Sequence, residues 1–160
     1  MSPNYVLQRT PGTFYVSTYH RGPAPLNTAL AMLPLRLGYF PSLKGESTVL
    51  LSGSSEAVGL LSAELARFVA SAASAWAVHE HVLVPRPHSV RLFASRTPPP
   101  SASDGFYWPC GAADFPSVLS RLSAVAAATE AHHYFTLAPS TAQLLVSVGE
   151  YSEQWWAQHV

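Results

Sequence analysis

The sequence predicts an α+β fold, a two-layer sandwich in which a largely antiparallel sheet of six or seven strands carries two helices on one face. Short apolar runs closed by Gly or Pro alternate with two segments of helical periodicity, and this alternation recurs in both halves of the chain. A length of 160 residues suits one domain with its own core. Gathering the helices on one side of a mostly antiparallel sheet is the packing expected for this class.

Composition divides the chain into an arm, residues 1–33, and a single α+β domain, residues 34–160. The arm is rich in Pro and Gly and has no helical periodicity. Its aromatic residues, among them Tyr5, Phe14 and Tyr19, distinguish it from a plain linker. We therefore expect the arm to pack on a neighbour or to stay partly loose.

The first elements of the domain are two strands and a helix. Residues 35–40 alternate loosely and stop at Pro41, and residues 48–52 form an apolar run closed by Gly53. Ser54 or Ser55 can cap a helix over 55–74, with Glu56 in its first turn. The apolar stripe of this helix is Val58, Leu61, Leu65, Phe68, Val69 and Ala72.

The middle of the chain predicts two strands, 77–84 and 89–95, joined by a turn around Pro85 and Pro87. An exposed Pro-rich loop over 97–105 then leads to a short strand at 106–108.

A second helix is expected from Asp114 as the cap, with Pro116 tolerated in its first turn. Its apolar stripe is Val118, Leu119, Leu122, Val125 and Ala126. Residues 132–137 and 142–148 complete the domain as a hairpin.

The two halves suggest a duplication. In each half a strand leads through a turn, at Gly53 or at Gly111, into a helix and then two strands. Two βαββ units in one domain would explain this order. The competing explanation is that short helix–hairpin patterns recur by chance in α+β proteins.

Charge narrows the function classes. Nine Lys plus Arg balance nine Asp plus Glu, so the formal net charge is zero, and only 11% of residues are charged. A balanced chain lacks the broad cationic surface that nucleic-acid binding requires, and no apolar run is long enough for a membrane helix. Because only 11% of the residues are charged, Ser, Ala and aromatic residues must make up much of the surface. We expect a homodimer, no nucleic acid, no membrane and a cytoplasmic location.

Histidine is the enriched reactive residue. His79 and His81 would share one face of the strand 77–84, and His132 and His133 open the matching strand of the second half. If these strands were adjacent, three imidazoles could hold zinc in a cleft between the halves. Ligand spacing of the HExxH type is absent, so inert surface or half-buried histidines are the favoured interpretation and no cofactor is predicted.

The single cysteine, Cys110, excludes an intrachain disulfide and a multi-cysteine metal site. It precedes the helix that begins near Asp114, where a thiol pKa can be lowered. A small apolar filler at a strand end is the favoured alternative. No Gly-x-Ser-x-Gly elbow, P-loop or GxGxxG is present, so no catalytic residue is predicted.

The C-terminal segment concentrates aromatic residues, with Tyr151, Trp155 and Trp156 close together. Such side chains carry much of the binding energy at protein interfaces. They also act as core plugs when a tail folds back. The sequence leaves both roles open, including one Trp inside and one outside, and we take these three residues as the candidate partner-binding site.

Two runs in the arm carry a resemblance: Asn4-Tyr5-Val6-Leu7-Gln8-Arg9-Thr10-Pro11 and Arg21-Gly22-Pro23-Ala24-Pro25-Leu26-Asn27. They resemble translated recombination-site sequence found in small bacterial integron (mobile gene cassette) proteins, a functionally uncharacterised and often dimeric group. The resemblance implies an accessory, non-enzymatic binding protein, such as an immunity-type protein. The alternative function is a small-molecule-binding protein or metal-dependent enzyme that uses the His-lined cleft.

Overall fold

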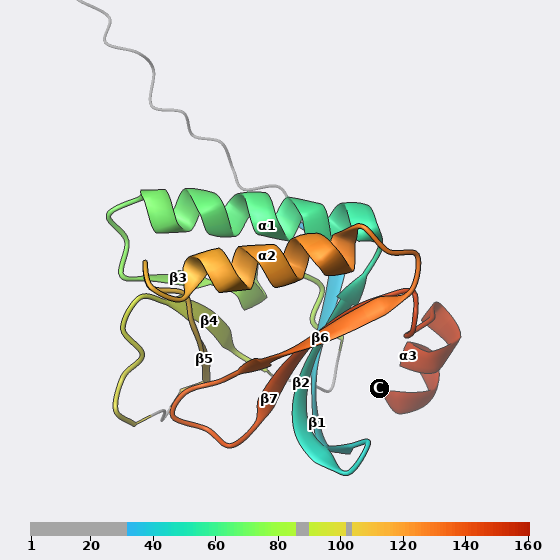
Figure 1. The fold of residues 1–160 in the computed structure, drawn as a ribbon. Helices are drawn as coiled ribbons and strands as arrows, with labels where there is room; N and C mark the ends of the chain where they lie inside the picture. Colours follow the sequence, from blue (N-terminus) through green and yellow to red (C-terminus); the bar gives the residue numbers. More distant parts are fainter. Residues whose placement is uncertain (1–31, 86–89, 102–103) are drawn as a thin grey trace, which may run out of the picture.

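The computed structural model describes residues 32–85, 90–101 and 104–160. It confirms the α+β class, with α1 and α2 lying side by side over the strands (Figure 1). The elements are β1 (Leu35–Leu43), β2 (Glu46–Gly53), α1 (Ser55–Ala70), β3 (Ala75–Ala77), the 3-10 helix η1 (Val78–Glu80), β4 (Leu92–Ser95), β5 (Phe106–Pro109), α2 (Phe115–Ala126), β6 (Ala131–Thr136), β7 (Gln143–Val148) and α3 (Glu153–His159). The arm lies outside the described residues except for Met32 and Leu33, and Leu33 is buried in the core.

The strands form two sheets of mixed type rather than the one largely antiparallel sheet predicted. A four-stranded sheet has the order β1-β2-β7-β6, and a three-stranded sheet has the order β3-β4-β5. Three pairings are antiparallel, but β2 with β7 and β4 with β5 are parallel. The α+β class is confirmed, but the expectation of one largely antiparallel sheet is wrong in the number of sheets and in these two parallel pairings.

The parallel pairings follow from an exchange of strands between the two predicted units. The element order β2-α1-β3-β4 is repeated, apart from η1, as β5-α2-β6-β7. The first strand of each unit pairs with the last strand of the other unit, at Val49 with Leu144 and at Trp108 with Ala94. Each sheet thus contains strands of both units, which ties the two halves into one domain.

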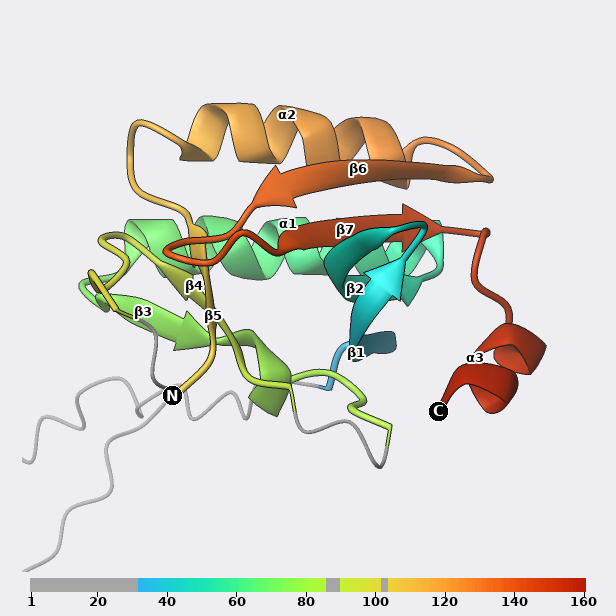
Figure 2. The ribbon, with the colours of Figure 1, turned by 90° about the horizontal axis from the view of Figure 1, so that it is seen from below.

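Isolated bridges connect the two sheets at their margins. Leu83 pairs with β1, donating from its backbone to Leu35 (2.9 Å) and accepting from Leu37 (2.8 Å). On the other side, the backbone N–H of Ala138 donates to the carbonyl of Tyr107 at 2.8 Å. The described strands therefore enclose a core shared by both sheets and by α1 and α2 (Figure 2).

The predicted first helix forms, with Ser54 as its cap: Ser54 Oγ accepts from the Ala57 N–H at 3.2 Å. The helix ends at Ala70 rather than at residue 74. Arg96 explains part of this, because its guanidinium donates to the carbonyl of Val69 (2.6 Å) in the last turn and to that of Ala73 (2.8 Å) beyond it. Orphan carbonyls at a helix end need such partners.

The second helix forms without the predicted side-chain cap. Asp114 stands at the cap position but makes no capping hydrogen bond with its side chain. The backbone N–H groups of Asp114 and Phe115 instead donate to the Gly111 carbonyl, at 3.0 and 2.9 Å. A turn of the chain thus starts this helix.

The predicted strand 77–84 is wrong. Only Ala75–Ala77 pair with β4, and the chain then turns through η1. His79 stabilises the turn, since its Nδ1 lies 3.0 Å from the Leu92 carbonyl oxygen. The chain needs this turn because Leu83 must reach β1. The predicted strand 89–95 is shorter, beginning at Leu92, and residue 89 lies outside the described residues.

Candidate functional site

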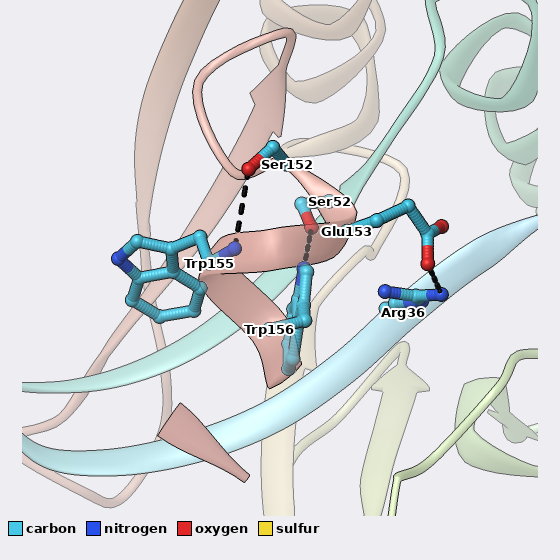
Figure 3. Close-up of polar contacts among 6 residues, drawn as sticks. All are labelled: Arg36, Ser52, Ser152, Glu153, Trp155 and Trp156. Carbon is cyan, nitrogen blue, oxygen red and sulfur yellow. Dashed lines mark hydrogen bonds and ion pairs between the residues drawn. The ribbon is translucent and has the colours of Figure 1, made fainter. Parts of the chain in front are cut away.

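The C-terminal segment forms a helix, α3, that packs on the face of the four-stranded sheet opposite to α1 and α2. Gly149 turns the chain away from β7 with a φ of 78°, and a Cβ there would lie 2.4 Å from the Thr129 carbonyl oxygen, so only glycine fits. Ser152 then caps α3 by accepting from the Trp155 N–H at 3.1 Å. These local contacts place Trp156 over the sheet, while the ring of Trp155 extends in a different direction (Figure 3).

Trp156 is the plug, because only 3% of it is exposed. Its ring packs on Leu50 and Leu145, and its Nε1 donates to Ser52 Oγ at 2.9 Å (Figure 3). Gly38 makes room for it, since a Cβ at that position would lie 3.0 Å from the indole ring. A buried indole whose N–H is satisfied is a stable anchor.

Trp155 stays at the surface as a half-buried residue. Its ring lies 4.7 Å from that of Tyr151 and 5.3 Å from that of Phe40, centroid to centroid, both edge to face. Tyr134 of β6 packs against the same apolar cluster. We call Phe40, Tyr134, Tyr151 and Trp155 the aromatic surface. Of the two roles left open for the tail, Trp156 takes that of the core plug, and Trp155 lies at the surface, as the interface role requires.

A groove of about 410 Å³ runs beside α3. Its walls are mostly apolar side chains from α3 and from the segment after η1: Leu83, Val84, Pro85, Trp156, Ala157 and Val160. An ion pair between Arg36 and Glu153 crosses this region and joins β1 to α3 (Figure 3). The groove therefore combines an apolar lining with one fixed pair of charges.

A polar cluster lies next to the turn into α3. Glu150 accepts from Ser147 Oγ at 2.7 Å, and His132 Nδ1 lies 2.6 Å from its other oxygen. Burial pushes the pKa of Glu150 up, but these two hydrogen bonds and the charges of His132 and Lys44 outweigh it and hold the pKa below its ordinary value. Glu150 thereby stays charged and ties β6 and β7 to the turn.

Tyr151 and Lys44 adjoin this cluster. The Lys44 ammonium lies 6.0 Å from the centroid of the Tyr151 ring. The tyrosinate charges of Tyr151 and Tyr134 and the Glu150 carboxylate raise the pKa of Lys44 despite slight burial. Burial of Tyr151 raises the pKa of its phenol. The Lys44 ammonium, as a nearby charge and a hydrogen-bond donor, opposes this rise in the pKa of Tyr151.

The four candidate histidines have separate surroundings. His79 lies edge-on to Phe93, and His81 stacks on Trp76 at 5.6 Å. On β6, His132 pairs with Glu150, and His133 has a lowered pKa because of burial and then of Arg121 and His132. Within residues 32–85, 90–101 and 104–160, no three His, Cys, Asp or Glu side chains gather closely enough to hold a metal ion. The predicted convergence on one cleft is therefore not present there.

Cys110 is fully buried in the core, and its desolvation, with a smaller contribution from Asp114, raises the thiol pKa to about 12. A thiol in this state is a poor nucleophile, as expected for the apolar filler. None of the described helices combines the length and apolar character needed to cross a membrane.

The outward face of the three-stranded sheet holds an aromatic pair that the sequence analysis did not single out. The rings of Phe93 and Tyr107 stack at 5.1 Å, and the Arg91 guanidinium lies 5.7 Å from the Phe93 centroid. Tyr107 donates to Asp104 at 2.7 Å, and this bond raises the pKa of Tyr107. Alternation within 92–95 and 106–109 is the signal that would have exposed these residues.

Comparison of the chain with family models, with curated proteins and with solved structures gave no match. The two runs that resemble integron cassette sequence lie in the arm, outside the described residues. The candidate site is accordingly defined by its geometry, namely the aromatic surface and the neighbouring groove.

Proposed function

We propose that this protein is a non-enzymatic binding protein that takes another protein chain on its aromatic surface. The first such chain is a second copy of itself, which makes the protein a homodimer. An accessory, immunity-like role from a mobile gene cassette fits a protein that acts by binding. A cytoplasmic location is part of the same proposal.

The observation that carries the proposal is the partial exposure of the Trp155 side chain. Trp155 remains half-buried while its neighbour Trp156 is sealed under α3. Tyr151 and Phe40 flank it edge to face, so a rigid aromatic group is already assembled. Such groups lose little conformational entropy on binding and dominate interface energetics. A net charge of zero also removes long-range repulsion between copies.

Light scattering after size exclusion tests the proposal on the full chain. One chain has a mass of 17.2 kDa, so the wild type is expected near twice that value at micromolar concentration. Trp155→Ala should shift the protein toward the monomer mass. Gln154→Ala, an exposed neighbour on α3, is the matched control and should leave the dimer intact. A wild type that runs only as the monomer contradicts the proposal.

A further inference from the structure

The outermost strand of the four-stranded sheet, β6, has a backbone edge that no described strand covers. β6 spans Ala131–Thr136 and pairs only with β7 among the described strands. In Figure 2 it lies on the side of the sheet away from β1, below α2. His132 and Thr136 are exposed, and His133 and Tyr134 are half-buried, so the strand lies at the molecular surface.

The opposite edge of the same sheet is treated differently. The beginning of β1 pairs with the segment after η1, because Leu83 donates to the Leu35 carbonyl and accepts from the Leu37 N–H. Just before β1, the Leu33 N–H donates to the His81 carbonyl at 2.6 Å. The first part of the β1 edge is therefore occupied within the fold, and a register shift between Phe40 and Leu43 makes the remainder irregular. Uncovered edges in monomeric proteins are normally blunted by Lys, Pro, bulges or inward charges.

β6 carries none of these protective features. Its sequence is Ala-His-His-Tyr-Phe-Thr, with no Lys, Asp, Glu or Pro, and its register with β7 is unbroken over all six residues. Such an edge presents a row of backbone donors and acceptors that an added strand can satisfy. Side-chain charge therefore offers little resistance to a second strand.

We propose that two copies of this chain pair antiparallel through their β6 edges, which joins their four-stranded sheets into one. The inference rests on the self-association proposed above and identifies the β6 edge as the dimer interface. An antiparallel strand pairs with itself about a twofold axis, so one edge satisfies both copies and the assembly closes as a dimer. The formal net charge of zero removes long-range repulsion between two copies.

The pairing is continuous with the aromatic surface. Tyr134 lies on β6 and packs in the same cluster as Tyr151 and Trp155. In a register centred on Tyr134, the two Tyr134 side chains meet at the axis on the outward face. His132 then faces Thr136 of the second copy, and the aromatic surfaces of both copies lie on one side of the joined sheet.

Placing like charges at positions 132 and 136, which would face each other across the axis, tests this interface. The double variant His132→Lys with Thr136→Lys sets two like-charged pairs across the axis while a cation stays beside Glu150. The concentration at half dimerisation should rise by about tenfold or more, since like charges directly opposite each other destabilise paired strands. Thr141→Lys is the control: it adds a charge at an exposed position in the β6–β7 connection.

Light scattering separates the outcomes. A dimeric wild type and a dimeric control beside a monomeric double variant support the inference. If the double variant is as dimeric as the wild type, the edge pairing is overturned and the proposed function stands. A wild type that is monomeric removes the proposed function itself.

Amide hydrogen exchange on the wild type keeps the inference testable if the double variant does not fold. Protection of residues 131–136 should increase as the protein concentration crosses the dimer midpoint. Equal protection at concentrations where the chain is monomeric overturns the inference, because the cover would then come from the same chain.

Discussion

The apolar side chains on the outward faces of the two sheets are covered in different ways. On the four-stranded sheet, Leu50 and Leu145 are fully buried because α3 lays Trp156 over them. On the three-stranded sheet, Phe93 and Tyr107 cover each other by stacking and remain half-buried. One face is sealed by a separate element, and the other is shielded by its own side chains.

The difference shows what a sheet face must provide before a helix such as α3 can cover it. The sealed face offers Gly38, which leaves space for the edge of the indole ring, and Ser52, whose hydroxyl accepts from the indole N–H. The other face offers bulky rings with Arg91 and His79 around them. A large buried group requires space and a polar partner, and only the first face supplies both.

The largest expected effect is on the sealed face. Trp156→Ala removes the plug and leaves Ser52 without its donor, so the free energy of unfolding should fall by about 3–5 kcal/mol. Chemical denaturation measures this loss, with Gln154→Ala on the exposed side of α3 as the control. A loss below about 1 kcal/mol would mean that α3 contributes little to closing this face.

A smaller effect is expected on the self-stacked face. Phe93→Ala removes one half-buried ring and its contact with Tyr107, so unfolding should become easier by about 1 kcal/mol. The same denaturation experiment applies, with Arg91→Ala as the control that keeps the aromatic pair. A loss as large as that of Trp156→Ala would show that this face is also sealed, and the contrast would disappear.

The smallest effect concerns the turn that brings α3 to its sheet. The pKa of Glu150 in the folded chain lies below its ordinary value of about 4.5, so its carboxylate stabilises the fold above that pH. This stabilisation is lost as the pH falls through the lowered pKa. The melting temperature of the wild type should therefore exceed that of Glu150→Gln near neutral pH.

The gap between these two melting temperatures should close as the solution is acidified below about pH 4.5, the ordinary value. Glu130→Gln, at an exposed position just before β6, is the control for a general charge effect. A gap that does not change with pH would assign the role of Glu150 to packing instead of charge.

The sequence by itself determined the elements whose information is local. Val58, Leu61, Leu65 and Phe68 follow helical spacing behind a serine cap, and all four are buried in α1. The hairpin of β6 and β7 also forms close to its predicted bounds, because the two strands are neighbours in the chain and pair with each other. The repeated order of strand, helix and two strands was likewise visible from turn residues and periodicity.

Tertiary structure alone decided how these elements are joined. Parallel pairing of β2 with β7 links residues far apart in the chain, and local patterns do not encode which partner a buried strand takes. His79 and His81 are spaced as on one face of a strand. The chain instead turns through η1 at His79, because Leu83 pairs with β1 rather than with β4.

The candidate site divides in the same way. The aromatic residues of the tail were recognisable from composition, but which of them faces inward depended on Gly38 and Ser52, which stand on strands far from α3 in sequence. Trp156 meets both and is buried, whereas Trp155 on the next position of the helix points elsewhere and stays at the surface. The physical reason is that burial of a large polar-tipped ring is decided by the cavity and the hydrogen-bond acceptor it finds, and only the folded chain brings these together.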